Sequence, residues 1–324
     1  MTTSTTSIRS EKSTTVRAVA ATPMATFRLR AVRGGLRVLS HVAPEGAAVI
    51  AERMFLTPRR YPRPPAEISV LASARRRLLP TRYGVLAAWE WPARVAADAP
   101  TVLLVHGWEG RGAQLGALVE PLTSAGFRVV TFDAPGHGDS PGERSSFFHF
   151  AEAVERAAHV FGPLHAIVAH SMGGAVTLWA SRTGQLATRL VMIAPPLDLR
   201  DFTRTFSRAL GLPEDVRGRV HRRLGARFGV PVEAVRAEAL APAMRGALLV
   251  VHDDADSEVP IACGEAIARA WPGATLIRTH GLGHRRILRD AATLEATTRF
   301  VSQGHAWDSV RGTPAHPVRA RPRV

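Results

Sequence analysis

The sequence predicts an α/β fold, in which a mostly parallel, doubly wound sheet carries a small helical cap insertion. From about residue 68, short apolar runs alternate with amphipathic runs, which is typical of a parallel sheet with helices on both faces. The apolar run 166–169 leads directly into a serine turn and a helix-compatible run. The segment 197–243 is helical in pattern and too long for a plain connection, so we expect it to form the cap.

The predicted strands and helices follow one another in a regular order. A strand at 85–91 precedes one at 101–105, whose short continuous apolar run is expected of a central strand covered on both faces. A helix over 112–124 ends before Gly126, a common stop signal. Further strands are expected at 127–132, 166–169, 190–193, 248–252 and 275–279. Further helices are expected at 147–160, 261–270 and 287–300.

Three regions are expected along the chain. Residues 1–65 comprise a basic tail, a docked helix and a linker, residues 66–304 form the α/β domain, and residues 305–324 form a second basic tail. Residues 1–23 are rich in Ser and Thr without an apolar period, which predicts disorder. The linker is predicted to be stiff because of its prolines, Pro58, Pro62, Pro64 and Pro65.

The composition narrows the class of protein. With 324 residues, 46% hydrophobic and 21% charged, the chain is long enough for a full core and ordinary for a soluble globule. No apolar run approaches the roughly 18 to 20 residues that span a bilayer, and no secretory leader pattern is present. The single cysteine, Cys263, excludes an internal disulfide framework, so a cytoplasmic location is expected.

The net charge of +15 lies mainly at the two ends of the chain. Residues 1–77 carry +10 and residues 305–324 carry +3, whereas residues 78–304 carry only +2. No zinc-finger spacing or RNP motif accompanies this charge, so nucleic acid is not an expected partner. The basic segment 24–57 is predicted to be a helix docked on the domain, although Gly34-Gly35 interrupts its pattern. A weak contact of this segment with an anionic membrane surface is the alternative.

Ser171 is the candidate nucleophile, in the run Ala169-His170-Ser171-Met172-Gly173-Gly174. A sharp strand-to-helix turn raises such a hydroxyl above the sheet edge, and small residues two positions before and after it let the strand and helix cross closely. A serine hydroxyl is a weak nucleophile that needs a base within hydrogen-bond reach and an acid that orients the base. The later loops must therefore supply both partners.

His284 is the candidate base. It lies in Gly281-Leu282-Gly283-His284, just after the last predicted strand. His280 and His252 are its rivals, but His280 is expected at the strand end, and His252 comes too early to follow the acid. As a general base, His284 would take the proton from the serine hydroxyl.

Asp256 is the candidate acid. It lies in the loop 253–260 after the preceding strand, so the chain order is nucleophile, acid, base. Asp253 and Asp254 share this loop, but at most one of the three carboxylates can face the imidazole, and the others are expected to cap the next helix or to be solvated. Asp254 is the second choice. Asp133 ends an earlier strand and is expected to be structural, and Asp198 is a remote alternative.

Two backbone amides are expected to stabilise the oxyanion of an acyl-transfer transition state. The residue after the nucleophile, Met172, supplies one amide. The loop after the strand 101–105, His106-Gly107-Trp108-Glu109-Gly110, is expected to supply the other through Trp108. The loss of one such donor costs on the order of 3 kcal/mol of transition-state stabilisation.

Over roughly residues 80–302 the chain resembles the α/β-hydrolase superfamily. The resemblance rests on the motifs His106-Gly107-Trp108, Asp133-Ala134-Pro135-Gly136-His137-Gly138-Asp139-Ser140, the Ser171 elbow, Asp256-x-x-Val259-Pro260 and Gly283-His284. It implies a Ser-His-Asp hydrolase with a covalent acyl-enzyme and with neither a metal nor another cofactor. Two positions depart from the pattern, because Ala169 and Asp253 stand where glycine is commoner.

The predicted function is therefore a serine hydrolase that cleaves carboxylic esters or related acyl compounds of small molecules. A thioesterase or an acyltransferase would keep the same triad and is one alternative. A catalytically silent α/β-hydrolase scaffold that binds a ligand or partner is another, but it is expected to lack a triad member, and none is missing here.

Overall fold

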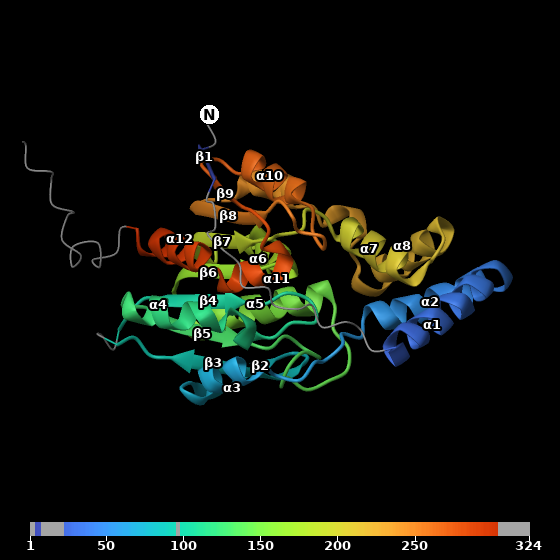
Figure 1. Ribbon diagram of the computed structural model, residues 1–324, viewed down its shortest axis with the longest axis horizontal. Coiled ribbons are helices and arrows are strands. Elements are labelled where there is room, and N and C mark those ends of the chain that lie inside the picture. The colour runs from blue at the N-terminus through green and yellow to red at the C-terminus, as the bar shows by residue number, and fades with distance from the viewer. Residues whose placement is uncertain (1–3, 8–22, 95–97, 304–324) are drawn as a thin grey trace, which may run out of the picture.

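A nine-stranded sheet forms the centre of the molecule (Figure 1). The computed structural model describes residues 4–7, 23–94 and 98–303. Its strands lie in the order β1-β9-β8-β7-β6-β4-β5-β3-β2; neighbours from β1 to β5 are parallel, and β3 is antiparallel to both β5 and β2. The strands are β1 (Ser4–Ser7), β2 (Arg75–Thr81), β3 (Gly84–Trp91), β4 (Thr101–Val105), β5 (Arg128–Phe132), β6 (Leu164–His170), β7 (Ala187–Ile193), β8 (Ala247–Asp253) and β9 (Thr275–Thr279).

Helices cover both faces of this sheet, which confirms the predicted doubly wound α/β fold. On β4, Leu103 and Val105 belong to the core on one face, and Val102 and Leu104 belong to the core on the other. The first core includes α5 (Phe147–Phe161), α6 (Met172–Ala180) and α10 (Ile261–Ala270). The second includes the 3-10 helices η1 (Gly112–Leu118) and η5 (Ile287–Arg289), with α4 (Val119–Ser124) and α12 (Ala291–Ser302).

Two predicted helices are divided in the structure. The segment 112–124 is a 3-10 helix followed by α4, in which Pro121 has no amide hydrogen to donate to the preceding turn. The segment 287–300 begins as η5, and α12 starts only after Asp290, whose side chain accepts a hydrogen bond from the Thr293 amide. A short helix, α11 (Gly283–Arg286), directly precedes η5. Another 3-10 helix, η2 (Ser181–Thr183), follows α6.

Three elements were not predicted. Strand β2 does not show the alternation of apolar and polar residues that marks a half-buried strand. Only Leu79 is buried, and Arg75, Arg76 and Arg77 are exposed, which is typical of a charged edge strand. Helix α3 (Pro65–Ala72) starts at the last residue of the expected linker and otherwise lies in the expected α/β domain, at a place where no helix was predicted. Strand β1 pairs with the open edge of β9, so the prediction of disorder is wrong for its four residues. The other residues of that predicted tail, 1–3 and 8–22, lie outside the described residues.

The cap lies between β7 and β8 in the chain. It consists of α7 (Leu199–Leu210), α8 (Glu214–Phe228), η3 (Val232–Ala234), α9 (Ala237–Leu240) and η4 (Ala241–Ala243). The α7 helix begins after Asp198, whose carboxylate accepts the amide of Arg200 over 2.8 Å. None of the described helices combines the length and the apolar character needed to cross a membrane.

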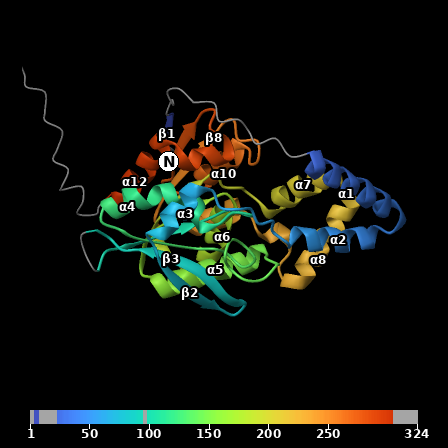
Figure 2. The same cartoon turned by 60° about the horizontal axis from the view of Figure 1, so that its bottom comes forward.

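The basic N-terminal segment forms two helices and not one. Helices α1 (Pro23–Val42) and α2 (Pro44–Phe55) pack against each other and beside α7 and α8, at the end of the molecule away from the sheet (Figures 1 and 2). The α1 helix continues through Gly34 and Gly35, because packing of buried side chains such as Leu36 outweighs the low helix propensity of glycine. The segment that was predicted to dock on the domain as one helix thus docks on the cap as two helices.

Two acidic residues of α2 fasten this hairpin to α8. The Glu52 carboxylate, 4% exposed, accepts hydrogen bonds from Arg223 (2.6 Å) and Arg227 (2.7 Å). Glu45 pairs with Arg219 and again with Arg223, at 3.0 and 3.1 Å. Burial would raise the pKa of Glu52, but the hydrogen bonds from Arg227 and Arg223 lower it below its ordinary value.

Replacing Glu52 with alanine is expected to lower the free energy of unfolding by about 1–3 kcal/mol, because two arginines lose a buried partner. Glu45→Ala, which removes an exposed partner of the same helix, is expected to do much less. Since the pKa of Glu52 is lower in the folded state, its contribution is complete above the unfolded pKa of about 4.3 and is lost as the pH falls through the folded pKa. Urea denaturation of both variants at neutral and acidic pH measures these effects. Equal losses for the two variants would contradict the assignment.

The proline-rich segment before α3 is also fixed to the α/β domain. The Arg60 guanidinium donates to three backbone carbonyls in the loop after β5. The Arg63 guanidinium lies 3.0 Å from the buried Asp133 carboxylate and 2.6 Å from that of Asp139. The stiffness expected from the prolines is therefore supplemented by charged contacts between residues 70 or more positions apart in the sequence.

Candidate active site

The predicted site residues follow four parallel strands. Trp108 lies in the loop after β4, Ser171 directly follows β6, Asp256 follows β8 and His284 follows β9. Because the carboxyl ends of parallel strands meet at one edge of a sheet, these loops converge at the same edge. Met172, the remaining predicted residue, is the first residue of α6.

Ser171 occupies a strained backbone position. Its φ of 54° and ψ of −128° lie in a region that residues other than glycine rarely adopt. The Ser171 amide donates to the carbonyl of Ile193 at the end of β7 (2.8 Å), and its carbonyl accepts from the amide of Gly174 (2.9 Å). These bonds hold the sharp turn, which leaves the serine half-buried.

Two glycines let the elbow lie directly against the loop after β4. A Cβ atom at Gly173 would lie 2.5 Å from the carbonyl oxygen of His106, so a side chain there would push α6 away from β4. A Cβ atom at Gly107 would lie 2.9 Å from the Cβ of Ser171. The close crossing that the small residues predicted is present on the Gly173 side.

His284 and Asp256 form a buried hydrogen-bonded pair. The Nδ1 of His284 lies 2.7 Å from Oδ2 of Asp256, and the two side chains are 7% and 0% exposed. The carboxylate can only accept, so Nδ1 carries the hydrogen and Nε2 is left as the basic nitrogen of the neutral ring. The other carboxylate oxygen, Oδ1, accepts the amides of Glu258 (2.8 Å) and Val259 (2.9 Å).

Asp256 is held in its ionised form. Burial alone would raise its pKa, but His252, His284 and the Val259 amide together hold the pKa of Asp256 well below its usual range. The Nε2 of His252 lies 3.6 Å from Oδ2 and 3.0 Å from the Val259 carbonyl, to which it donates. A permanent negative charge beside His284 fixes the tautomer of its ring and would stabilise the imidazolium during proton transfer.

Asp253 connects the loop that carries Asp256 to the loop that carries His284. Its buried carboxylate accepts the amides of Leu282 (3.0 Å) and Gly283 (2.8 Å) and the hydroxyl of Thr279 (2.7 Å). Burial would raise the pKa of Asp253, yet these hydrogen bonds lower it. The chain directly before His284 is thus anchored on β8. Sequence reasoning missed this role, and the aspartate in place of the commoner glycine was the one signal of it.

Asp253→Asn is expected to lower the free energy of unfolding by about 2–4 kcal/mol. The NH₂ group of the asparagine would replace a carboxylate oxygen that accepts backbone amides, so two donors would face each other. Asp254→Asn, one residue further along the exposed part of the loop, is the matched control and is expected to change it little. Urea denaturation at neutral pH compares the two. Identical midpoints for Asp253→Asn and the wild type would contradict the anchoring role.

The alternative acids are engaged elsewhere. Asp254 hydrogen-bonds to His280 on the exposed surface and does not face His284. Asp133 accepts the backbone amides of Gly112 and Asp139 and pairs with Arg63. Asp198 caps α7. In the described part of the chain, no group of three or more His, Cys, Asp and Glu side chains is arranged to hold a metal ion.

His170 links the elbow to the base loop. Its Nε2–H donates to the backbone carbonyl of His284 over 2.9 Å, and the two rings lie 4.7 Å apart between centroids. Burial, together with the neighbouring His284, lowers the pKa of His170 to about 3. The ring is therefore neutral and contacts His284 without charge repulsion. His170, which directly precedes Ser171, thereby holds the loop that carries His284 against the turn at Ser171.

The two predicted oxyanion amides are available for hydrogen bonding. Met172 begins α6, so its amide has no carbonyl one turn earlier within the helix. Among the described residues, the Trp108 amide has no protein acceptor. The loop around it is held by a hydrogen bond from the Gly110 amide to the Gly107 carbonyl (3.0 Å) and includes Glu109 at a φ of 56°.

The Trp108 side chain belongs to an aromatic cluster. Its ring stacks on Phe55 at the end of α2, with 6.3 Å between centroids. Phe55 also contacts Phe202 and Phe206 of α7 edge-on, at 5.4 and 5.2 Å. The N-terminal hairpin, the loop after β4 and the cap therefore share one apolar wall beside the site.

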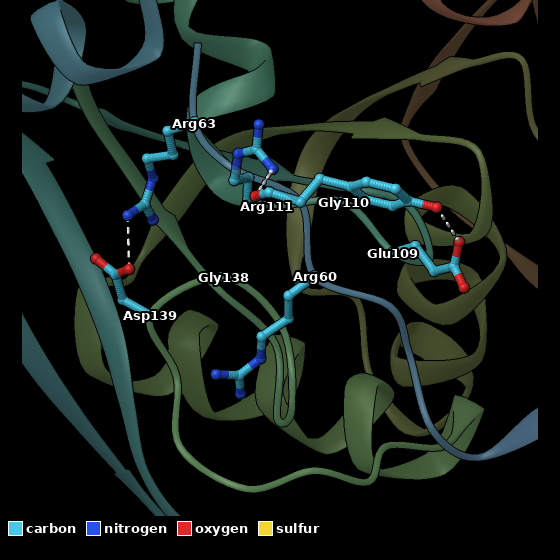
Figure 3. A pocket seen from close by; sticks show the side chains of 8 residues that line it. Arg60, Arg63, Glu109, Gly110, Arg111, Gly138 and Asp139 are labelled. Carbon is cyan, nitrogen blue, oxygen red and sulfur yellow. Dashed lines mark hydrogen bonds and ion pairs between the residues drawn. The ribbon is translucent and has the colours of Figure 1, made fainter. Parts of the chain in front are cut away.

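A separate polar cavity of about 210 Å³ lies between the proline-rich segment and the loop after β4 (Figure 3). Figure 3 shows Arg63 reaching Asp139. The Tyr61 hydroxyl donates to Glu109, and Arg111 donates to the carbonyl of Tyr61. Each of the charged side chains of the cavity has at least one hydrogen-bond or ion-pair partner within the protein. The cavity is lined by Arg60, Tyr61, Arg63, Glu109, Gly110, Arg111, Gly138 and Asp139, and not by the residues predicted for catalysis.

Known proteins resemble this chain over part of its length. The solved structure of Est1E from Butyrivibrio proteoclasticus with bound ferulic acid has a TM-score of 0.58 at 19% identity and covers 70% of this chain and 96% of that one. A pimeloyl-[acyl-carrier protein] methyl ester esterase of Xanthomonas campestris pv. campestris is 27% identical over 253 residues, 64% of this chain and 97% of that protein. The magnesium-chelatase 30 kDa subunit of Rhodobacter capsulatus is 32% identical over 111 residues, and the match spans only 33% of this chain and 37% of that subunit.

One protein family matches more than half of the chain. Residues 97–279 match the family described as Serine aminopeptidase, S33 (Hydrolase_4). The matched span contains β4, the Ser171 elbow and the Asp256 loop, and it ends with β9, before His284. The resemblance that the motifs predicted is confirmed, and the chain belongs to this family of α/β-hydrolases.

Proposed function

We propose that the protein is a serine hydrolase that cleaves carboxylic esters of small molecules through a covalent acyl-enzyme. The observation that carries the proposal is the buried pair of His284 and Asp256, which His170 holds against the strained turn at Ser171. A buried carboxylate that orients an imidazole beside a serine elbow is the arrangement that makes an alcohol nucleophilic.

In the proposed reaction, Ser171 Oγ bonds to the ester carbonyl carbon while His284 Nε2 takes the hydroxyl proton. The carbonyl oxygen becomes an oxyanion, which the amides of Met172 and Trp108 stabilise. The intermediate collapses as the carbon–oxygen bond to the alcohol breaks, and His284 returns its proton to the leaving alkoxide. Water, deprotonated by His284, then attacks the acyl-enzyme and releases the acid and the free serine.

The charges around the site favour an ester over the amino-terminal peptide bond that the family description names. An aminopeptidase must hold the ammonium group of its substrate, for which a carboxylate is the natural partner. Glu109, beside the proposed oxyanion donor, is paired with Arg59 (2.9 Å) and with the Tyr61 hydroxyl. The wall of Phe55, Trp108 and Phe202 instead suits an apolar acyl or alcohol group.

The proposal is tested by turnover of p-nitrophenyl butyrate and by covalent labelling with a fluorophosphonate. We expect the wild type to hydrolyse the ester and to be labelled once, and Ser171→Ala to do neither. An aminoacyl p-nitroanilide assayed in parallel separates ester from aminopeptidase activity. Labelling that persists in Ser171→Ala would contradict the nucleophile, and turnover of the anilide alone would contradict the ester substrate class.

A further inference from the structure

The outer surface of the N-terminal hairpin exposes aliphatic side chains. In the described part of the chain, five of eleven exposed large hydrophobic residues lie on α1 and α2: Val32, Val38, Val42, Val49 and Ile50. Val38 and Val42, one turn apart near the end of α1, are 65% and 79% exposed. Such a concentration of exposed apolar side chains on two neighbouring helices is a feature of interaction surfaces.

Exposed arginines accompany these side chains on the same two helices. Arg30, Arg33 and Arg37 form a stripe along α1 at the spacing of one helix face, and Arg53 lies one turn after Val49 and Ile50 on α2. None of the four has an acidic partner among the described residues. We name this surface, made by Arg30, Arg33, Arg37, Val38, Val42, Val49, Ile50 and Arg53, the hairpin surface.

The acidic residues of the hairpin lie on its opposite side. Glu45 and Glu52 both face α8, where Arg219, Arg223 and Arg227 neutralise them. The hairpin is therefore attached to the cap by its negative charges, of which Glu52 is buried and Glu45 is exposed but paired with two arginines of α8. Figures 1 and 2 show α1 and α2 at the extremity of the molecule, where a flat surface can reach them.

We propose that the hairpin surface docks on an anionic lipid surface. The arginines match acidic headgroups, and the valines and Ile50 fit the boundary between headgroups and acyl chains, where an amphipathic helix lies in the plane of the membrane. A purely electrostatic partner such as a nucleic acid would explain the arginines and leave the aliphatic side chains without a role. An acidic protein is the competing occupant that the experiment must separate.

The docked hairpin would also contact the apolar wall of the proposed catalytic site. Helix α2 ends at Phe55, which contacts both Trp108 and the cap residue Phe202. The docked hairpin and the apolar wall of the site are thus continuous, which favours ester substrates that partition into lipid. This consequence rests on the proposed function, whereas the docking itself does not.

Co-sedimentation of the full chain with vesicles tests the docking. We expect binding to phosphatidylcholine vesicles that contain phosphatidylglycerol, no binding to phosphatidylcholine alone, and release by salt, since the Debye length falls from about 10 Å at 0.1 M to about 3 Å at 1 M. Each arginine at an anionic surface contributes about fivefold to affinity, so the triple variant Arg30→Gln/Arg33→Gln/Arg37→Gln is expected to bind roughly 100-fold more weakly. Val38→Ser/Val42→Ser is expected to lose about tenfold.

Matched controls carry the same changes elsewhere on the surface. Arg75→Gln/Arg76→Gln/Arg144→Gln removes three exposed arginines, and Ile68→Ser/Val160→Ser removes two exposed aliphatic groups. Both are expected to bind like the wild type, as is the inactive Ser171→Ala protein, so failure of docking and failure of catalysis are distinguishable. Circular dichroism checks that each variant is folded.

Three results would overturn the proposal. The first is no sedimentation with phosphatidylglycerol vesicles at low salt. The second is equal binding by the α1 arginine variant and its control, which would place the lipid contact elsewhere. The third is retention on immobilised polyglutamate without vesicle binding, which would identify an acidic protein surface as the partner.

Discussion

Ser171→Ala is expected to lower kcat toward p-nitrophenyl butyrate by about 10⁶-fold, because the bond-forming atom of the proposed acylation step is removed. KM is expected to change little, since the Ser171 hydroxyl contributes to the transition state far more than to substrate binding. Steady-state kinetics give both constants. Ser181→Ala, at the other end of α6, replaces a half-buried serine that donates to the Thr177 carbonyl and is expected to leave kcat unchanged.

Ser171→Gly separates the catalytic role of this residue from a structural one. Glycine adopts a φ of 54° without strain, so this variant is expected to lose the same activity while its melting temperature stays equal or rises. A loss of activity in proportion to a loss of folded protein would contradict the assignment. The strain at Ser171 is otherwise unexplained by packing, because a glycine would satisfy the turn better than a serine does.

The fold was predictable because its signals are local. Each central strand is a short apolar run, and the burial of alternate residues of β4 in the cores on opposite faces explains why residues 102–105 are all apolar. The order of strand ends then places Ser171, Asp256 and His284 at one edge without knowledge of the packing. The geometry supports Asp256 over Asp254 as the partner of His284. The sequence could only rank the two aspartates, because the direction of each side chain depends on how the loop turns.

The unpredicted features depend on contacts between residues distant in sequence. Nothing near Glu52 indicates that its partners are Arg223 and Arg227, more than 170 residues later, so the docking of the hairpin on the cap has no local signal. The anchoring role of Asp253 depends in the same way on amides that follow β9. A buried carboxylate needs hydrogen-bond donors, and here those donors come from residues that are close only in the folded protein. The sequence around each carboxylate therefore does not reveal its role.

Asp256→Asn is expected to lower kcat by about 10⁴-fold while the loop keeps its shape. The Oδ1 position of Asp256 accepts two backbone amides, from Glu258 and Val259, so the carbonyl oxygen of an asparagine would stay there. Its NH₂ group would then face Nδ1 of His284, which can meet a donor only as an acceptor. The ring hydrogen would move to Nε2, and the nitrogen proposed to take the serine proton would no longer be basic.

Asp254→Asn is the matched control, because it makes the same change two residues earlier on the same loop. Asp254 pairs with His280 at the surface, so this variant is expected to keep kcat within about twofold of the wild type. The ratio of the two kcat values isolates the orientation of His284 from any general effect of removing a negative charge near the site. Comparable losses in both variants would show that loop charge matters and tautomer control does not, whereas full activity of Asp256→Asn would remove Asp256 from the mechanism.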